Sequence, residues 1–187
     1  VRFIGNYSSG KMGFALAEAC AERGAEVTLV AGPVSLKTHH PAIKRIDVES
    51  AGEMYQAAMT AFPSSDAAIL CAAVADYRPE NASEQKIKRE TEREMTLHLV
   101  PNPDIAASLG AIKREGQVMV GFALETNDEA THAEGKLKRK NLDFIVLNSL
   151  RDQGAGFRCD TNKITIIDNA GGVTSYPLKT KREVACD

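Results

Sequence analysis

The sequence predicts an α/β fold: a three-layer, Rossmann-like, doubly wound and mostly parallel sheet with a projecting two-stranded β arm. Short apolar runs alternate along the chain with amphipathic helical patterns, which is the rhythm of βαβ units. The run 66–73 (DAAILCAA) consists almost wholly of small apolar residues, which is typical of a central parallel strand covered on both faces. The chain of 187 residues, 43% hydrophobic and 26% charged, has the size and composition of one ordinary domain.

Composition and charge exclude several classes of protein. A formal net charge of -2 gives no electrostatic reason for nucleic acid to be the main partner. No apolar run approaches the ~18 residues that a membrane span needs, and no signal peptide is visible, so we expect a cytoplasmic protein without a membrane partner. The cysteines show no metal-type spacing, so we expect reduced thiols at Cys20, Cys71, Cys159 and Cys186.

The opening stretch 1–13 (VRFIGNYSSGKMG) predicts a glycine-rich turn that leads into a helix. Ser8 or Ser9 is expected to cap that helix, which runs from about Lys11 to Arg23 and is followed by Gly24. The turn matches the first seven positions of a phosphate-binding P-loop, but Met12 replaces the hydroxyl residue that would hold Mg²⁺. It also lacks the dinucleotide fingerprint. A ligand loop and a plain strand-to-helix turn both remain open.

The next elements alternate regularly in type. They are strands 26–30 and 43–48 around a loop at 34–41, a helix that Ser50 caps and that ends near Phe62, and strand 66–73.

The middle of the chain breaks this rhythm. Residues 74–84 are predicted as loop, 85–89 as a short basic strand, and 95–100 (MTLHLV) as an alternating strand, so that 85–100 forms the arm. Asn102 and Pro103 are expected to act as cap and first residue of a helix that ends near Gly110. The remaining elements are strand 117–123, helix 127–140, strand 144–147 and a hairpin of strands 163–168 and 173–176.

Ligands of open α/β sheets lie beyond the carboxyl ends of the strands. The candidates at such positions are the Asn6 loop, residues 72–76, Phe122 and Asn148. Each charged candidate also has an explanation that involves no ligand. Asp76 could stabilise a turn, the KIKR run at 86–89 could protect an edge strand from aggregation, and Lys136 with Lys140 could form a solvated helix face. The residues alone therefore indicate a nucleotide- or phosphate-binding domain with no defined reaction.

Six ordered motifs give a more specific answer. NYSSGKMG, CAAVADYRP, KIKR, PNPDI, GFALET and KRKNLD resemble the bacterial phosphopantothenoylcysteine synthetases. That family implies a ligase in which CTP activates 4′-phosphopantothenate as an acyl-cytidylate with Mg²⁺, after which L-cysteine displaces CMP to form the amide. In many bacteria the enzyme is the C-terminal half of a coenzyme A biosynthesis protein whose N-terminal half is a flavin-dependent decarboxylase.

The resemblance also implies roles for individual residues. Asn6 and Lys86 are the implied catalytic residues; Asn6, Ala72, Ala73 and Asp76 bind the acyl substrate; and the nucleotide contacts are Leu70, Cys71, Ala72, Asp76, Lys86, Pro103, Asp104, Ile105, Ala106, Phe122, Lys136 and Lys140. Metal ligands remain unassigned. Lys86 also begins the lysine-rich flap that, by the resemblance, closes over the intermediate. Two residues depart from the family's pattern: Gly5 replaces a serine, and Arg89 replaces the last lysine of this flap.

Two expectations about organisation follow. Residues 1–187 form a single synthetase domain, as a fragment that lacks the family's first strand and last helix. The arm at 85–100 forms a homodimer, because its apolar side and open edge would otherwise face water. Two other interpretations compete with the ligase: a non-catalytic dimerising nucleotide-binding fragment, and an NAD(P)-dependent oxidoreductase. Against the oxidoreductase, no acidic residue ends the second strand, where Val30 is followed by Ala31 and Gly32.

Overall fold

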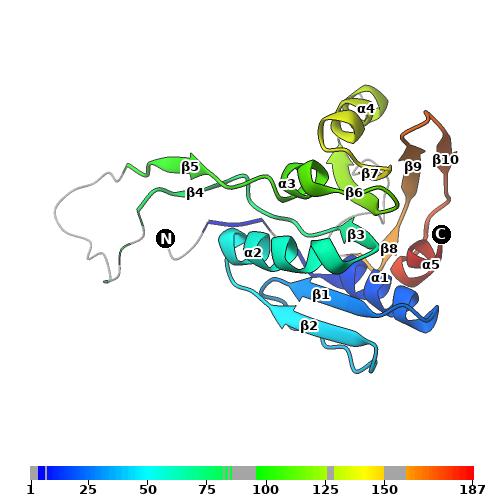
Figure 1. Ribbon diagram of the computed structural model, residues 1–187, viewed down its shortest axis with the longest axis horizontal. Helices are drawn as coiled ribbons and strands as arrows, with labels where there is room; N and C mark the ends of the chain where they lie inside the picture. The colour runs from blue at the N-terminus through cyan, green and yellow to red at the C-terminus, as the bar shows by residue number, and fades with distance from the viewer. Residues whose placement is uncertain are drawn as a thin grey trace.

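The computed structural model describes residues 4–6, 8–81, 83, 85, 96–125, 129–149 and 159–187, and only the backbone of 124, 125, 129–132 and 149. Its main sheet has five strands in the order β10-β9-β7-β6-β3 (Figure 1). Strands β3 (Ala67–Leu70), β6 (Val118–Glu125) and β7 (Phe144–Ser149) are parallel. The hairpin of β9 (Ile164–Asp168) and β10 (Val173–Ser175) adds two antiparallel strands beside β7.

A second, parallel sheet consists of β1 (Val27–Ala31) and β2 (Ile43–Asp47). Among the described residues no ladder joins β1 to β3, so β3 lies at the end of the larger sheet. The prediction that strand 66–73 is central and covered on both faces is therefore wrong. With a neighbour on one side only, β3 leaves the Ile69 side chain 39% exposed.

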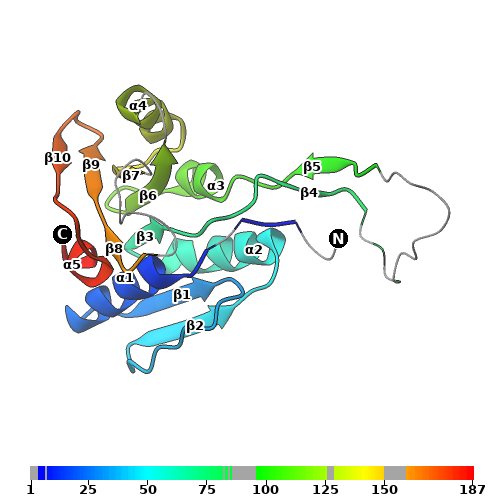
Figure 2. The same cartoon turned by 180° about the vertical axis from the view of Figure 1, so that it is seen from behind.

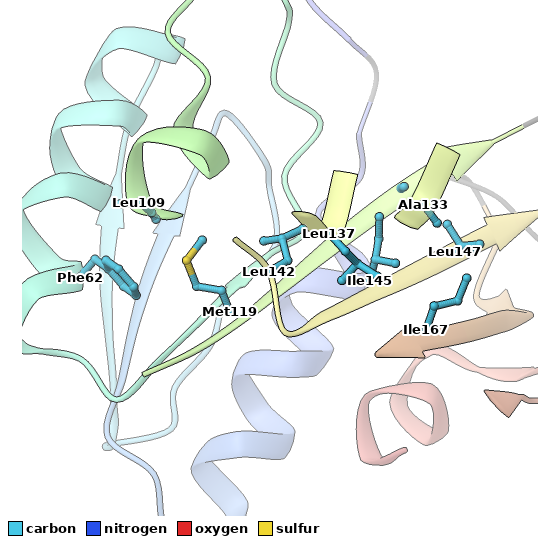
Figure 3. Close-up of a cluster of buried hydrophobic side chains, with 10 residues drawn as sticks. Phe62, Leu109, Met119, Ala133, Leu137, Leu142, Ile145, Leu147 and Ile167 are labelled. Carbon is cyan, nitrogen blue, oxygen red and sulfur yellow. The ribbon is translucent and has the colours of Figure 1, made fainter. Parts of the chain in front are cut away.

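Helices α2 (Ala51–Ala61), α3 (Ile105–Ile112) and α4 (Glu129–Arg139) cover one face of the larger sheet, with the short 3-10 helix η1 (Phe62–Ser64) after α2. Phe62, Leu109 and Leu137 reach the sheet from these helices and pack with Met119 and Ile145 (Figure 3). Because side chains alternate along a strand, Ile145 and Leu147 face this layer and Val146 faces the opposite one.

Helices α1 (Lys11–Glu22) and α5 (Lys181–Cys186) lie side by side on the opposite face. Met12 and Val184 pack there against Val146 and Ile164. The two apolar clusters thus place the sheet between two helical layers, which confirms the predicted three-layer, mostly parallel α/β fold. A short antiparallel pair, β8 (Thr161–Asn162) with β11 (Lys179–Thr180), was not predicted; it leads into α5.

Helix boundaries follow the capping residues in part. The Ser50 side chain accepts a hydrogen bond from the Glu53 N–H and caps α2 as predicted. Gly24 follows α1 with a φ of 91°, also as predicted. The N-cap of α1, however, is Gly10 in a left-handed conformation and not Ser8 or Ser9. A Cβ at Gly10 would meet Val34 at 3.2 Å, so both conformation and space favour glycine there.

The arm extends away from the body of the molecule, as both views show (Figures 1 and 2). Its described strands are β4 (Tyr77–Pro79) and β5 (Leu99–Pro101), which pair antiparallel. The arm thus begins at Tyr77 and not at residue 85 as predicted, and of the described residues in the predicted strand 95–100 only 99 and 100 are in β5. The prediction of 74–84 as loop is therefore wrong, because three of its residues form β4. The predicted basic strand 85–89 lies largely outside the described residues. No helix in the described part of the chain is long and apolar enough to span a bilayer.

Candidate functional site

The loop that follows β3 at its carboxyl end lies beside the turn that precedes α1. The carboxamide of Asn6 donates a hydrogen bond from Nδ2 to the carbonyl oxygen of Val74 at 3.2 Å. Small side chains in residues 72–76 (AAVAD) let the backbone of this loop approach its neighbours closely. We call residues 72–76 the 72–76 loop. Its Ala72 and Asp76, and the neighbouring Asn6, are exposed and therefore accessible to a ligand.

Asn102 connects the 72–76 loop to the segment that enters α3. Its backbone N–H donates to the Asp76 carbonyl oxygen at 2.7 Å, and its side-chain Nδ2 donates to the Ala75 carbonyl oxygen at 2.8 Å. From β4, Nη1 of Arg78 donates to Asn102 Oδ1 at 3.2 Å and to the Pro101 carbonyl oxygen at 2.7 Å. Residues 23 to 27 positions apart in the chain are thereby held together at one edge of the sheet.

The N-cap of α3 is Asp104, whose side chain accepts from the Ala107 N–H at 3.0 Å. The prediction that Asn102 and Pro103 cap and begin this helix is therefore wrong. Asn102 directs its amide to Ala75 instead, and the helix begins two residues later, at Ile105. The positive dipole end of α3 follows shortly after Asn102, which contacts the 72–76 loop, and such a helix start would stabilise an anion.

Lys140 lies at this same helix start. Its Nζ is 3.0 Å from Asp104 Oδ2. Burial raises the pKa of Asp104, but hydrogen bonds from the Ala107 N–H and the Lys140 ammonium outweigh it and hold that pKa below its ordinary value. Lys136 lies one turn earlier on α4 and is partly buried. The structure thus brings Asp104 and Lys140 together across α3 and α4.

A close backbone approach between α3 and the end of α4 sets the position of Lys140. A Cβ built on Gly110 would lie 2.1 Å from the Lys140 carbonyl oxygen, so any other residue there would force the two helices apart. Asn141 adopts a positive φ of 52° and donates from Nδ2 to the Gly110 carbonyl oxygen at 3.0 Å. The Lys140 side chain therefore runs from its backbone beside Gly110 to the start of α3.

Other implied site residues lie in the core. Leu70 packs against the cluster under α2, α3 and α4, whereas Cys71 and Phe122 pack with the cluster under α1 and α5. Burial raises the pKa of the Cys71 thiol to about 12, so this thiol is protonated at neutral pH. Phe122 lies on the sheet face opposite to α4, and thus apart from Lys136 and Lys140. Lys86 lies outside the described residues.

Some polar contacts at this end of the sheet were not predicted. The buried Asn162 donates from Nδ2 to Asn148 Oδ1 at 2.9 Å and so fixes a side chain at the end of β7. Lys11, at the start of α1, forms an ion pair with Asp160. Asn162 stands in the sequence DTNK, which has the composition of an ordinary turn, and Arg78 stands in a stretch predicted as loop. Asn162 carried no signal beyond its residue type, whereas Arg78 belongs to the CAAVADYRP motif but was given no role of its own.

The whole chain, residues 1–187, matches the family model of the DNA/pantothenate metabolism flavoprotein C-terminal domain. A protein of an unknown prokaryotic organism, named cysteine/cysteine sulfinic acid decarboxylase, is 59% identical over 100% of this chain and 52% of that protein. The coenzyme A biosynthesis bifunctional protein CoaBC of Vibrio parahaemolyticus is 52% identical over 89% of this chain and 42% of that protein. CoaBC of Escherichia coli is 48% identical over 97% of this chain and 45% of that protein. The chain thus spans about half the length of these curated relatives.

Solved structures agree with this grouping. The crystal structure of the C-terminal domain of a CoaBC protein matches with a TM-score of 0.80 at 40% identity, over 99% of this chain and 83% of that chain. The DNA/pantothenate metabolism flavoprotein from Streptococcus pneumoniae shares the fold with a TM-score of 0.82 at 20% identity, over 96% of this chain and 86% of that chain. Since the family model covers every residue and these relatives match along nearly the whole chain, the protein belongs to the DNA/pantothenate metabolism flavoprotein C-terminal domain family.

Proposed function

We propose that this domain is a phosphopantothenate–cysteine ligase of coenzyme A biosynthesis, which uses CTP and passes through an acyl-cytidylate. Its relatives named CoaBC are coenzyme A biosynthesis proteins, and this chain matches about half of each. One observation carries the proposal: three segments with implied substrate or nucleotide roles, at Asn6, in the 72–76 loop and at the start of α3 beside Lys140, meet at one edge of the sheet.

In the first step, a carboxylate oxygen of 4′-phosphopantothenate attacks the α-phosphorus of CTP, and pyrophosphate leaves as the bond to its bridging oxygen breaks. Both reactants are anions, so the site must supply positive charge to hold them together. The first-turn N–H groups of α3 and the Lys140 ammonium provide such charge in the described part of the chain. We assign Lys86 to the same task, as part of a flap that closes over the reacting groups and excludes water.

In the second step, the amine of L-cysteine attacks the acyl carbon, CMP departs, and the amine loses a proton as the amide forms. Asn6 suits this step because a carboxamide can donate to the acyl oxygen without ionising. Its present contact is one backbone carbonyl of the 72–76 loop, on the exposed side of that loop. We propose that Ala72, Ala73 and Asp76 bind the acyl substrate beside it.

Mg²⁺ belongs to this proposal as an ion carried by the nucleotide. Among the described residues there is no group of three or more His, Cys, Asp or Glu side chains placed to hold a metal. Mg²⁺ commonly binds through substrate phosphates, waters and one or two carboxylates, and Asp76 and Asp104 are acidic side chains at this edge of the sheet. The ion would neutralise charge on the triphosphate during attack.

The quaternary and cellular context is part of the proposal. We propose a homodimer formed through the arm, because β4 and β5 expose large apolar side chains. We propose further that the domain works in a fusion with a flavin-dependent decarboxylase, which the family resemblance implies; the relatives named CoaBC are called bifunctional, and the chain spans about half of each. The four free cysteines fit the reducing cytoplasm.

The name of the 59% identical relative describes a decarboxylase. The match to this chain covers 52% of that relative. We assign the decarboxylase activity to the part of the relative that lies outside the match. The domain incubated alone with cysteine should accordingly release no carbon dioxide.

The test is incubation of the protein with 4′-phosphopantothenate, L-cysteine, Mg²⁺ and either CTP or ATP, followed by mass analysis. We expect phosphopantothenoylcysteine and CMP in the CTP reaction. Omission of cysteine should leave a bound acyl-cytidylate and free pyrophosphate. Product formation with ATP alone would replace CTP in the proposal, and no product with either nucleotide would contradict ligase activity.

A further inference from the structure

Asn102 has a different place in the structure from the one its motif, PNPDI, predicts. It does not cap α3, since Asp104 does so. Two of its donors go instead to consecutive carbonyls of the 72–76 loop: the backbone N–H to Asp76 O at 2.7 Å and Nδ2 to Ala75 O at 2.8 Å. We propose that Asn102 is a positioning residue that sets the 72–76 loop against the start of α3. This inference rests on the ligase function proposed above.

The chemistry of the side chain fits this role. A carboxamide offers a donor and an acceptor on one short, planar group. Asn102 is partly buried and uses both, because Nδ2 donates to Ala75 while Oδ1 accepts from Arg78 at 3.2 Å. Aspartate would keep the acceptor but lose the donor, and alanine would lose both. The two side-chain contacts can therefore be separated by substitution.

The place of Asn102 in the chain gives these contacts their importance. The chain leaves the 72–76 loop directly into β4 and returns through β5, so Asn102 closes the base of the arm. Pro103 and Asp104 follow at once and begin the nucleotide side of the proposed site. One residue thus holds together the segment that binds the carboxylate substrate and the helix start that binds the triphosphate.

A specific kinetic signature follows from this geometry. The acyl substrate is assigned to Asn6 and the 72–76 loop. The nucleotide shares Ala72 and Asp76 of that loop, but its other assigned contacts lie outside it. Binding of either ligand alone therefore needs little of the exact register between the two segments. Attack of the carboxylate on the α-phosphorus needs both segments at the correct separation, and a displacement of about 1 Å can cost on the order of 100-fold in rate. Loss of the Ala75 contact should therefore reduce the rate of acyl-cytidylate formation much more than the affinity for either substrate.

The experiment measures pyrophosphate release in a single turnover, and the dissociation constants of CTP and 4′-phosphopantothenate separately. For Asn102→Ala we expect the rate to fall about 10- to 100-fold while each dissociation constant changes less than about threefold. Asn102→Asp should lose nearly as much rate, because it too lacks the donor to Ala75. A wild-type rate in Asn102→Asp, or affinity losses as large as the rate loss, would overturn the inference.

Asn169→Ala is the matched control. Asn169 also links distant segments through its carboxamide, with Nδ2 donating to Asp143 Oδ1 at 3.3 Å, but it lies in the turn between β9 and β10. This variant should keep the wild-type rate. If Asn102→Ala fails to fold, Asn102→Asp, which retains the Arg78 contact, carries the comparison with this control.

Hydrogen exchange gives a readout that needs no turnover. Peptides from residues 71–78 and 103–109 should exchange faster in Asn102→Ala than in wild type, and should be unchanged in Asn169→Ala. If the wild-type protein forms no product, the proposed function fails, and the exchange data alone decide whether Asn102 holds the two segments. Unchanged exchange in Asn102→Ala would reject the positioning role even in an active ligase.

Discussion

Single side chains at the sheet edge differ in how strongly the fold holds them. Asn6 is exposed and has one hydrogen bond to the 72–76 loop, so its carboxamide is available to a ligand. Lys140 is held against Asp104 at the start of α3. The Lys113 ammonium bonds Asp143 Oδ2 at 2.7 Å at the amino end of β7, away from the candidate site. From these contacts we expect separable effects for substitutions at Asn6, Lys140 and Asp143.

Asn6→Asp should separate the two half-reactions. The side chains are nearly the same size, and the exposed contact to Val74 is worth about 0.5–1.5 kcal/mol at most, so the fold should persist. A carboxylate cannot donate to the acyl oxygen of the intermediate. With CTP, Mg²⁺ and 4′-phosphopantothenate, the variant should accumulate bound acyl-cytidylate that cysteine consumes slowly, as followed by mass analysis of quenched samples. Normal consumption would return Asn6 to the role of a turn residue.

Lys140→Gln should weaken nucleotide binding. Removal of one charge-assisted contact to a phosphate should raise the dissociation constant of CTP about 10- to 100-fold, as measured by calorimetry. Lys138→Gln is the control, because Lys138 is exposed on α4, two residues before Lys140, and lines a different hollow of about 300 Å³ together with Leu142 and Gly171. Equal weakening in both variants would mean that only the net charge of α4 matters.

Asp143→Asn should destabilise the fold in a pH-dependent way. Burial raises the pKa of Asp143, but the Lys113 ammonium and the Met119 N–H outweigh it and hold that pKa below its ordinary value. A lowered carboxyl pKa contributes stability that is fully present above the unfolded pKa of about 3.9 and is lost as the pH falls through the folded value. We expect a loss of about 2–3 kcal/mol in the free energy of unfolding at pH 7, shrinking below about pH 4.

Asp47→Asn provides the comparison for this measurement. Asp47 pairs with Arg45 on β2, but its side chain is 68% exposed, against 23% for Asp143. Urea titrations should show a change of less than about 1 kcal/mol for Asp47→Asn at any pH. Equal losses in the two variants would contradict the structural role given to Asp143.

Among the elements, the arm combines an apolar surface with little support from the body. Leu99 on β5 is 46% exposed and Tyr77 on β4 is 55% exposed. An isolated two-stranded ribbon is marginally stable in water, so contact with a second copy would stabilise it.

Leu99→Ser should therefore weaken the proposed dimer. Removal of a buried leucine from an interface costs about 1.5–3 kcal/mol, which is at least a tenfold rise in the dissociation constant of the dimer, seen by light scattering over a dilution series. Leu178→Ser replaces another exposed leucine, outside the arm, and should leave the dimer unchanged. A wild-type protein that is monomeric at micromolar concentration would remove the arm dimer from the proposal.

Elements with periodic patterns were predictable from sequence. The Ser50 cap predicted α2, and the turn between β9 and β10 marked its hairpin. The β4–β5 pair was not predictable as such, because strands of three residues have no measurable period and their pairing spans about 20 residues of chain. The start of α3 was predicted wrongly for a related reason. Asn102 and Asp104 are both good capping residues, and the contact of Asn102 with Ala75 decides between them.

The candidate site shows the same division. The residue types and motif order of Asn6, the 72–76 loop and PNPDI could be read from the sequence together with the family resemblance. The contacts among these segments could not be predicted from the sequence, because the contacts depend on where β3, α3 and α4 lie in space. Asn162 had no sequence signal, since one asparagine in a polar stretch is ordinary on a surface. Arg78 lies in the CAAVADYRP motif, but its contact with Asn102 depends on the pairing of β4 with β5.

At the scale of the whole molecule, the five-stranded sheet and the β1–β2 sheet differ in how well their strands are supported. Strands β6 and β7 are flanked on both sides and lie between two helical layers. Strands β1 and β2 form a sheet of their own, in which each strand has one partner among the described residues. Parallel pairs with open edges open more readily than central strands.

Native-state hydrogen exchange should reveal this difference. Amides of β6 and β7 should exchange only through global unfolding, whereas those of β1 and β2 should exchange through a smaller opening, at least 10-fold faster and with a weaker dependence on denaturant. Ile145 and Leu29 are suitable reporters because each lies within a ladder. Equal protection factors and equal denaturant slopes for both sheets would show that they unfold as one unit.

The contact between Gly110 and the Lys140 carbonyl has a consequence for how this domain diverges. Any side chain at position 110 would push the end of α4 away from α3 and carry the Lys140 ammonium with it. Selection should therefore remove variants at Gly110 as readily as variants at Lys140, while the exposed Ala111 and Ile112 beside it drift freely. A glycine with no chemistry of its own would then be retained as durably as the residues proposed to bind the nucleotide.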